Sequence, residues 1–356
     1  MSATSELRWG CIGTGNIAMA MAQQLTRLPF MALEAISSGS GRPIEEVDVK
    51  RAEFGYNRAL SLEDMLADPS VDIVYVASAS SAHAAQCLLA LRAGKPVLCE
   101  KPLTLSAADA ELIFAEAIRQ NLLLIDGTFS ACLPATTFIQ EHLSTIGKIH
   151  RVELHKKIRL KIMEGSPIIN VRELGGGLFD GCGSYTVHML CVIFGASAVA
   201  SLSSEDIEVV STPSPDGEVD WDTTVTIRMC GAVAVLTHRA ADEARRSVVA
   251  GESGSLEFTL PRLEDVALNG QLHKFPYGTG APFSDLPAHE PGAPVGVHAG
   301  LGVQALVVRD ALVSGFRGPG APHLTLDVMR AMAHAMDLVR RRIPSHLQFV
   351  SEDLEQ

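Results

Sequence analysis

The segment from Gly13 to Ala18, Gly-Thr-Gly-Asn-Ile-Ala, has the residue types and spacing that bind a dinucleotide. It fits G-x-G-x-x-A between a strand-like run and a helical pattern. The first glycine permits a tight turn, the second lets the backbone approach a pyrophosphate, and the small third residue lets helix and strand pack closely. A turn without a ligand is the alternative, but the context favours a cofactor. Its expected contacts are Gly13, Thr14, Gly15, Asn16 and Ile17.

The end of the second predicted strand bears on which dinucleotide is bound. An NAD site usually places an acid there for the ribose 2′-hydroxyl, whereas an NADP site offers cationic or hydroxyl donors. No acid follows Ile36 until Glu45. Ser38, Ser40 and Arg42 can partly neutralise the roughly two negative charges of a 2′-phosphate. The sequence favours NADP(H) over NAD(H); a flexible loop without this role is the alternative.

Lys101, in Glu100-Lys101-Pro102, follows a short predicted strand. It therefore lies at the carboxyl end of a parallel strand, where open α/β sheets bind ligands. An ammonium group there can hydrogen-bond an oxygen on which negative charge develops. On spacing alone, a charged pair at the surface is the more common explanation.

The elements that position these residues alternate between strand and helix, which predicts a parallel sheet covered by helices. Strands are expected at 7–12, 32–37, 71–77, 96–99 and 122–126, the third at the centre of the sheet. Helices are expected at 16–28, after Ser61, from a Ser81 cap to Ala93 before Gly94, and after Ser106.

Beyond Gly127 the rhythm changes, and longer β-rich stretches predict an α+β domain. We expect a Rossmann domain at 1–127 and a second domain at 128–356. Strands of the second are expected at 149–162, 199–210, 223–229, 232–238 and 255–260, an irregular excursion at 278–302, and helices at 303–313 and 324–342. Arg340-Arg341-Arg342 is expected to form a solvated helix end.

Four elements of the chain stand in the order found in the family named after glucose-fructose oxidoreductase, inositol dehydrogenase and a rhizopine catabolism protein, Gfo/Idh/MocA. They are the fingerprint at 13–18, the His83 segment, Glu-Lys-Pro at 100–102, and a Gly-rich segment from Gly175 through Tyr185 to Gly195. The chain resembles this family over most of its length. Its tyrosine resembles the branch of dimeric dihydrodiol dehydrogenase, D-xylose dehydrogenase and sugar ketoreductases.

This resemblance implies a doubly wound Rossmann domain followed by an α+β domain with a large open, mostly antiparallel sheet. It implies hydride transfer between a nicotinamide and a carbinol or carbonyl carbon of a sugar, polyol or cyclic diol. Lys101 and Tyr185 would serve the reacting oxygen, because a tyrosine with a pKa of about 10 needs a nearby cation. Ala79, His83 and Glu100 would lie beside the cofactor, His83 ordering a loop.

Two positions depart from the family pattern. Relatives carry an acid four residues before the catalytic Tyr or His, where this chain has Gly181, with Asp180 displaced by one. Three alternatives stay open: Asp180 turns toward the substrate, His188 takes the place of the missing acid, or the substrate differs. Both side chains are therefore catalytic candidates. Ala131 stands where relatives often have a pocket arginine.

Two alternatives to a simple sugar, polyol or diol substrate stay open. One is a dehydrogenase or ketoreductase of a nucleotide-activated sugar, whose diphosphate a basic cluster could bind. That cluster, which could equally be an ordinary charged strand edge, is Lys156, Lys157, Arg159, Lys161 and Arg172. The other is a non-redox or sensory dinucleotide-binding protein.

Composition excludes several classes of partner. The 356 residues carry a formal net charge of −12, which offers no basic field to nucleic acid or an anionic membrane. The start of the chain shows no apolar leader, and the apolar runs are short, so we expect a cytoplasmic location. No histidine or cysteine spacing predicts a metal. A homo-oligomer, dimer or tetramer, is expected because an open sheet favours burial by a partner copy.

Overall fold

The computed structural model describes residues 5–39, 41–48, 55–160, 166–275, 297–321, 324–344 and 347. Ser40, Lys161 and most of the 278–302 excursion lie outside these residues. Contacts divide the chain into two units. The first contains Met1–Leu103, Asp109–Cys132 and Tyr277–Leu326, and the second contains Thr104–Ala108, Leu133–Pro276 and Asp327–Gln356.

The first unit is built on six parallel strands in the order β3-β2-β1-β4-β5-β6, which is the order of a Rossmann fold. The expected central strand is β4, and all its residues are buried. This confirms the predicted fold class for the first half. The strands are β1 (Leu7–Ile12), β2 (Met31–Ser37), β3 (Arg58–Ala59), β4 (Ile73–Val76), β5 (Val97–Cys99) and β6 (Leu124–Asp126).

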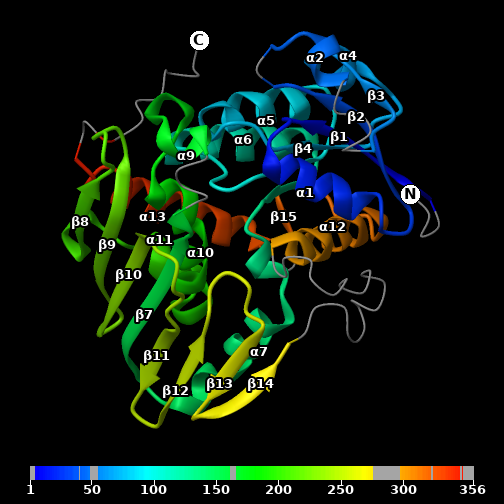
Figure 1. The fold of residues 1–356 in the computed structure, drawn as a ribbon. Coiled ribbons are helices and arrows are strands. Elements are labelled where there is room, and N and C mark those ends of the chain that lie inside the picture. Colours follow the sequence, from blue (N-terminus) through cyan, green and yellow to red (C-terminus); the bar gives the residue numbers. More distant parts are fainter. Residues whose placement is uncertain are drawn as a thin grey trace. The chain divides into compact units, whose positions relative to one another are not determined.

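Helices cover both faces of this sheet, with α5 and α6 on one face and α1 and α12 on the other (Figure 1). The helices are α1 (Asn16–Leu25), α2 (Ile44–Asp48), α4 (Leu62–Ala67), α5 (His83–Arg92), α6 (Ala107–Gln120), α12 (Val297–Val313) and the short η1 (Ser80–Ala82) and η2 (Phe129–Cys132). Ser61 caps α4, as expected, by accepting a hydrogen bond from the backbone N–H of Asp64 at 3.0 Å.

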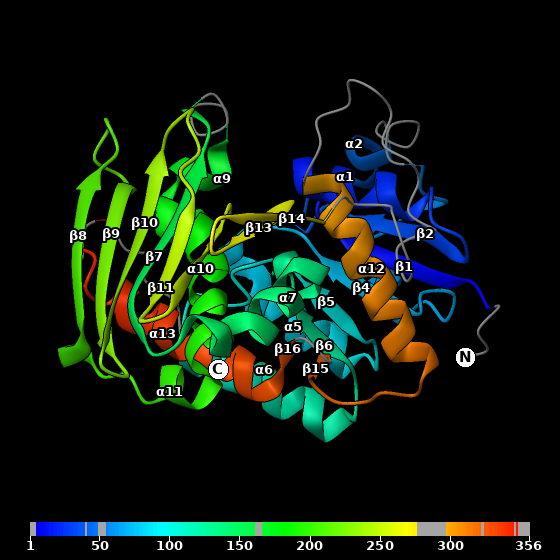
Figure 2. The same cartoon turned by 90° about the horizontal axis from the view of Figure 1, so that it is seen from below.

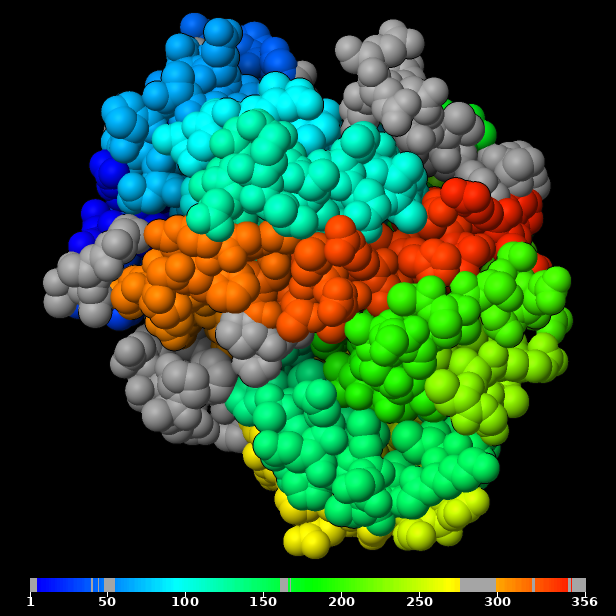
Figure 3. Space-filling model, turned by 180° about the vertical axis from the view of Figure 1, so that it is seen from behind, coloured from blue at the N-terminus to red at the C-terminus, as the bar shows by residue number. Residues whose placement is uncertain are grey.

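The chain returns to the first unit after the second unit's sheet. Helix α12 packs against α1, Pro319 pairs with Leu124 of β6, and β15 (Gly320–Ala321) pairs with β16 (Leu324–Thr325). Figure 3 shows α12, in orange, on the surface next to residues coloured cyan. The domain boundary expected after residue 127 stays a prediction. The contacts add that α12 joins the first unit although it lies far along the chain.

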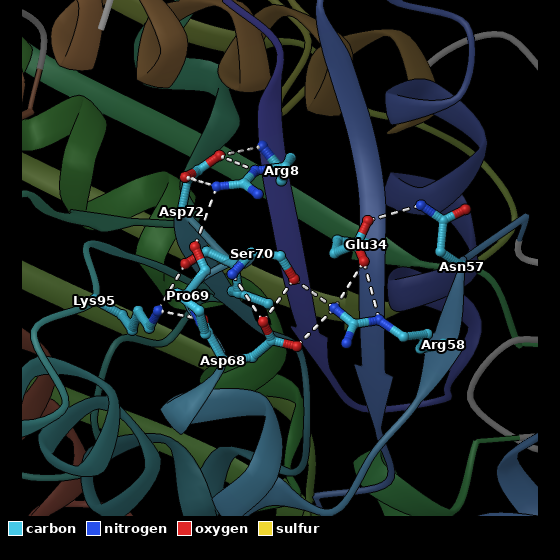
Figure 4. A network of polar contacts seen from close by, with 10 residues as sticks. Arg8, Glu34, Asn57, Arg58, Asp68, Pro69, Ser70, Asp72 and Lys95 are labelled. Carbon is cyan, nitrogen blue, oxygen red and sulfur yellow. Dashed lines mark hydrogen bonds and ion pairs between the residues drawn. The ribbon is translucent and has the colours of Figure 1, made fainter.

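A network of charges joins the amino-terminal ends of the parallel strands (Figure 4). Arg8 at the start of β1 makes an ion pair of 2.8 Å with Asp72, just before β4. Arg58 of β3 pairs with Glu34 of β2 and with Asp68. These arginine side chains are more than a third exposed, so each pair contributes modestly to stability. Their placement leaves the opposite edge of the sheet to the functional residues.

The second unit contains an eight-stranded sheet in the order β14-β13-β12-β11-β7-β10-β9-β8. Only β7 and β10 pair in parallel, so the predicted mostly antiparallel sheet is confirmed. The strands are β7 (Ile149–Ile158), β8 (Ile207–Pro213), β9 (Asp220–Met229), β10 (Ala232–Ala240), β11 (Ser247–Gly251), β12 (Gly254–Phe258), β13 (Asp265–Leu268) and β14 (Gln271–Lys274).

Helix α10 packs on strands β7, β9 and β10 of this sheet, as Figure 2 shows. The stretch Arg172–Phe194 is apolar enough to cross a membrane, but 83% of its window is buried within the protein, as in a core helix. The helices are α7 (Pro134–His142), α9 (Pro167–Asn170), α10 (Leu178–Phe194), α11 (Ala196–Ala200), α13 (Leu326–Arg340), η3 (Leu143–Ile146), η4 (Arg172–Leu174) and η5 (Ser204–Asp206).

Three local expectations were wrong. Ser81 does not cap α5, because it lies in the 3-10 turn η1 and the helix begins at His83. The strand expected at 199–210 begins only at Ile207, since α11 and η5 precede it. Ser203 and Asp206 form a capping box at the start of η5. Arg340 is not solvated: it is 5% exposed.

A buried carboxyl group holds the beginning of α10. Asp220, at the start of β9, accepts hydrogen bonds of 2.8 Å from the backbone N–H of Phe179 and from the Thr223 hydroxyl, both at Oδ2. Gly177 has φ +121°, and a Cβ there would lie 2.3 Å from Oδ1 of Asp220. Glycine is therefore required where the carboxyl meets the helix end.

Burial raises the pKa of Asp220 to about 6, against the lowering effect of its two hydrogen bonds and with a further rise from Asp180. The folded protein therefore holds this proton over a pH range in which the unfolded chain has released it. The stability that the bound proton contributes is lost as pH rises from about 4 to about 6.

We predict that Asp220→Asn reduces the loss of unfolding free energy between pH 4 and pH 7 by about 2–3 kcal/mol. One amide oxygen can accept both bonds that end at Oδ2. Urea unfolding at several pH values measures the effect. Asp220→Ala is the control and should be less stable at every pH, by about 1–3 kcal/mol. Equal pH slopes in the Asn variant and the parent chain would contradict the prediction.

Candidate active site

The fingerprint turn joins β1 to α1 at the carboxyl edge of the six-stranded sheet. Gly13 has φ +124°, and a Cβ there would lie 2.3 Å from the Ala77 carbonyl oxygen, at the end of neighbouring β4. Only glycine fits this position. Ala18 in the first turns of α1 is fully buried, as the close packing of helix and strand requires.

The beginning of α1 is arranged to receive an anion. Gly15 is its N-cap residue, provides no side-chain cap, and no acidic residue lies in the first turn. A Cβ built on Gly15 meets nothing within 4 Å, and Asn16 is exposed. The first N–H groups of a helix have no intrahelical acceptor and carry partial positive charge. The residues at this turn therefore fit the pyrophosphate of a dinucleotide.

Arg42 lies beside this turn, although the chain between it and β1 includes a helix and a strand. Its guanidinium donates a hydrogen bond to the Thr14 hydroxyl, and its backbone N–H donates to the Ser38 hydroxyl at 2.9 Å. The structure thus brings together the three residues that the sequence singled out at the fingerprint and after β2. This gives one cation and two hydroxyls, the donor set that suits a phosphate monoester.

His83 ties two turns of the sheet edge together. Its Nδ1 lies 2.8 Å from the Pro102 carbonyl oxygen, and its Nε2 lies 3.3 Å from that of Ser78. Burial lowers the pKa of His83 to about 4, so the ring is neutral near pH 7 and its single N–H donates to one of the two carbonyl oxygens. Ala79, the N-cap residue of η1, lies between Ser78 and His83 in the same loop. These contacts suit the expected loop-ordering role better than proton transfer.

Lys101 and two buried carboxyl groups lie at the ends of β5 and β6. Glu100 accepts a hydrogen bond of 2.7 Å from the Tyr75 hydroxyl, and its other oxygen accepts one from the Lys101 backbone N–H. Burial raises the pKa of Glu100 and of Asp126, while the positive charge of Lys101 opposes both rises. Lys101 itself is partly exposed. Lys101 is thus a partly exposed cation whose charge acts on two buried carboxyl groups.

Gly127 explains why the Glu-Lys-Pro turn and the end of β6 approach so closely. A Cβ at Gly127 would lie 2.7 Å from Cα of Glu100 and 3.0 Å from the backbone nitrogen of Lys101. Gln304 of α12 donates a hydrogen bond of 3.0 Å to the Asp126 carbonyl. The sequence did not indicate Gln304, because its partner is 178 residues away.

In the second unit, α10 carries the remaining catalytic candidates. Tyr185 is buried, at 6% exposure, and the ammonium nitrogen of Lys156 on β7 lies 5.7 Å from the centre of its ring. A cation near a phenol ring favours the ionised phenolate electrostatically. The structure therefore gives Tyr185 a positive neighbour, Lys156, from the cluster that could bind a diphosphate or be an ordinary charged strand edge.

Asp180 and His188 are both buried on the same helix. One oxygen of Asp180 accepts hydrogen bonds of 2.9 and 2.6 Å from the guanidinium of Arg340, which also donates to the Leu105 carbonyl. No local sequence signal could have found this pair, since 160 residues separate its members. Asp180 thus anchors α10 to α13, and its expected role toward substrate stays a prediction.

Known proteins resemble this chain over part or nearly all of its length. Residues 7–128 match the family model described as "Oxidoreductase family, NAD-binding Rossmann fold", GFO_IDH_MocA. The chain is 26% identical to trans-1,2-dihydrobenzene-1,2-diol dehydrogenase of Sus scrofa, covering 95% of this chain and 97% of the relative. The Mus musculus protein of that name is 31% identical over 56% of this chain and 59% of its own length. The D-xylose 1-dehydrogenase (NADP(+)) of Hypocrea jecorina is 30% identical over 49% of this chain and 50% of its own length.

Solved structures share the fold. KijD10, a 3-ketoreductase from Actinomadura kijaniata solved with NADP and TDP-benzene, superposes with a TM-score of 0.74 at 23% identity, covering 95% of this chain and 98% of that one. A levoglucosan dehydrogenase solved with NADH and levoglucosan gives a TM-score of 0.74 at 18% identity, covering 96% and 98%. At these identities the likeness shows the fold alone. Together with the fingerprint geometry, the matches show an NAD(P)-dependent oxidoreductase whose residues 7–128 fit the Gfo/Idh/MocA family model.

Proposed function

We propose that the protein interconverts an alcohol and a carbonyl group on a sugar, polyol or cyclic diol, and that it prefers NADP(H). The single observation that carries the cofactor preference is the Arg42 cluster with Thr14 and Ser38 beside the fingerprint turn. Relatives named for an NADP(+)-dependent xylose dehydrogenase and for dihydrodiol dehydrogenases support the substrate class. Spectrophotometry of NADPH consumption across a panel of carbonyl compounds tests it.

When bound, the nicotinamide exchanges a hydride with the reacting carbon, and the residues of this chain manage the oxygen. We propose that Tyr185 holds the proton at its phenolic oxygen and that the Lys101 ammonium stabilises the negative charge that develops on the substrate oxygen. The buried Glu100 and Asp126 carboxyls fix the charge balance around Lys101. The contact between the Lys101 ammonium and the substrate oxygen strengthens as negative charge accumulates on that oxygen, and so it favours the transition state.

The nucleotide-sugar alternative receives less support from the basic cluster. The Lys156 ammonium lies over the Tyr185 ring and donates to the Lys157 carbonyl, while the Lys157 ammonium donates to the Asp242 carbonyl. Arg172 pairs with Glu173 at 3.1 Å. Three of these five basic side chains are therefore engaged within the protein, and we favour an uncharged substrate.

We predict that Gly15→Ser weakens binding of NADPH by at least tenfold while leaving the melting temperature equal or higher. Serine is a better N-cap than glycine, worth a few tenths of a kcal/mol, but its side chain fills the space that the pyrophosphate needs. Cofactor fluorescence and thermal unfolding measure the two effects. Ser61→Ala is the matched control: it removes a cap from α4, so it should lower the melting temperature and spare binding. Unchanged NADPH affinity in the Gly15 variant would exclude the fingerprint as the site.

Replacing Arg42 tests the cofactor preference. Arg42→Leu should weaken NADPH binding about 10- to 100-fold and change NADH binding by less than about threefold, since only NADPH carries the 2′-phosphate that the guanidinium would bind. Arg27→Leu, an exposed arginine just beyond the other end of α1, is the control and should affect neither. An equal loss for both cofactors would show that Arg42 holds the turn and does not select the phosphate.

Substitutions of the two proposed catalytic residues should reduce turnover without loss of cofactor. Tyr185→Phe and Lys101→Met are each expected to lower kcat by about 10²- to 10⁴-fold, with NADPH affinity changed by less than about threefold for the tyrosine. Steady-state rates with the best carbonyl substrate measure this. Tyr56→Phe, which loses a buried bond to the Val47 carbonyl, is the control for stability. Full turnover in Tyr185→Phe would remove it as proton donor.

A further inference from the structure

The surface of α10 is accessible at one place along its first four turns. Among residues 175–191, all of which the structure describes, only Gly181 is not buried. Tyr185 lies four residues later, on the same face of the helix. Whatever approaches this face beside Tyr185 therefore meets the backbone of Gly181.

An apolar side chain lies against this accessible position, and an apolar cluster lies next to it on the same helix. A Cβ built on Gly181 would lie 3.5 Å from Cδ1 of Ile158, an ordinary van der Waals contact. Ile158 and Trp221, both partly exposed, pack against the buried Leu178 and Cys182 of the same helix. These side chains belong to one apolar cluster, together with Ile169 and Ala240.

The strand β7 places this apolar surface next to the charge at Tyr185. Lys156 and Ile158 are two residues apart on β7, so their side chains share one face of the sheet. Lys156 faces Tyr185, and Ile158 faces Gly181 one helical turn before it. The polar and apolar contacts of this face are thus about one turn apart, roughly 5 Å along the helix axis.

We propose that Gly181, Ile158 and Trp221 form a specificity surface for the apolar part of a carbocyclic substrate, a ring with CH or CH₂ groups next to the diol or ketone carbon. This inference rests on the proposed function, because it places the reacting oxygen at Tyr185. A hydroxyl group set against Gly181 and Ile158 would lose its water without gaining a partner, which is unfavourable. A polyol with hydroxyls around the whole ring is therefore disfavoured.

Two probes that share a six-membered carbocycle test this directly. trans-Cyclohexane-1,2-diol carries two hydroxyls, and myo-inositol carries six. Binding is measured by tryptophan fluorescence in the presence of NADP⁺, in a Tyr185→Phe background that prevents turnover. Trp221 lies in the proposed surface, whereas Trp9 is fully buried in the first unit. Trp221→Phe verifies the source of the signal.

We expect the diol to bind at least about tenfold more tightly than inositol, because each added hydroxyl would face an apolar wall. Gly181→Asp should bring the ratio of the two affinities to about one or below. Gly181→Ala is the matched control: it adds a methyl group at ordinary contact distance and keeps the surface apolar, so the ratio should stay within about threefold.

Inositol bound as tightly as the diol, or a ratio unchanged by Gly181→Asp, would overturn the inference. The companion measurement is oxidation of the diol by the chain with Tyr185 intact. Selective diol binding without oxidation at any NADP⁺ concentration would leave the specificity surface standing and remove the proposed function. Oxidation of inositol in preference to the diol would do the reverse.

Discussion

The common direction of six parallel strands is the constraint on which the first unit depends. Because every strand runs the same way, the residues that follow β1, β2, β4, β5 and β6 meet at one edge. Gly13, Ser38, Ala79, Lys101 and Asp126 each stand at such a strand end or within three residues of it. The amino-terminal ends meet at the opposite edge, where the arginine pairs of Figure 4 join them. The ion pairs between strands and the proposed cofactor-binding residues therefore lie in different parts of the sheet.

Three ionisable groups near the carboxyl edge, Glu100, Asp126 and His83, are buried, and burial decides their electrostatics. Burial raises the pKa of Glu100 and Asp126 and lowers that of His83, so each group is displaced toward its neutral form. The positive charge of Lys101 opposes the rise at both carboxyls. Since Glu100 uses both oxygens in hydrogen bonds within the protein, it holds the turn in place, and the partly exposed Lys101 is the charged group at these two strand ends that remains accessible.

Local signals predicted the parts of the fold that depend on neighbours in the chain. The bounds of β1, the Ser61 cap of α4, the parallel first sheet and the β-rich second unit agree with the sequence, because periodicity and capping act over a few residues. The mostly antiparallel pairing of the second sheet was implied by the family resemblance. Helix α10 was not expected as a helix: its first turn is held by Asp220, which accepts a hydrogen bond from the Phe179 N–H and lies 41 positions later in the sequence. Arg340 was misplaced for the same reason, since a buried partner cannot be recognised from flanking residues.

Asp180 lies one residue before Gly181 on α10. Since successive helical residues are separated by about 100°, the two residues lie on different faces of the helix. Asp180 faces Arg340 of α13, and Gly181 faces Ile158 of β7. Turning Asp180 toward substrate would break an ion pair whose side chains are 6% and 8% exposed and would leave the Arg340 charge buried alone. Breaking such a pair costs about 3–5 kcal/mol, more than a substrate hydroxyl can return through one hydrogen bond to a carboxylate, about 1.5–3 kcal/mol. Asp180 therefore holds the helix, and the face that bears Tyr185 lacks an acid at Gly181.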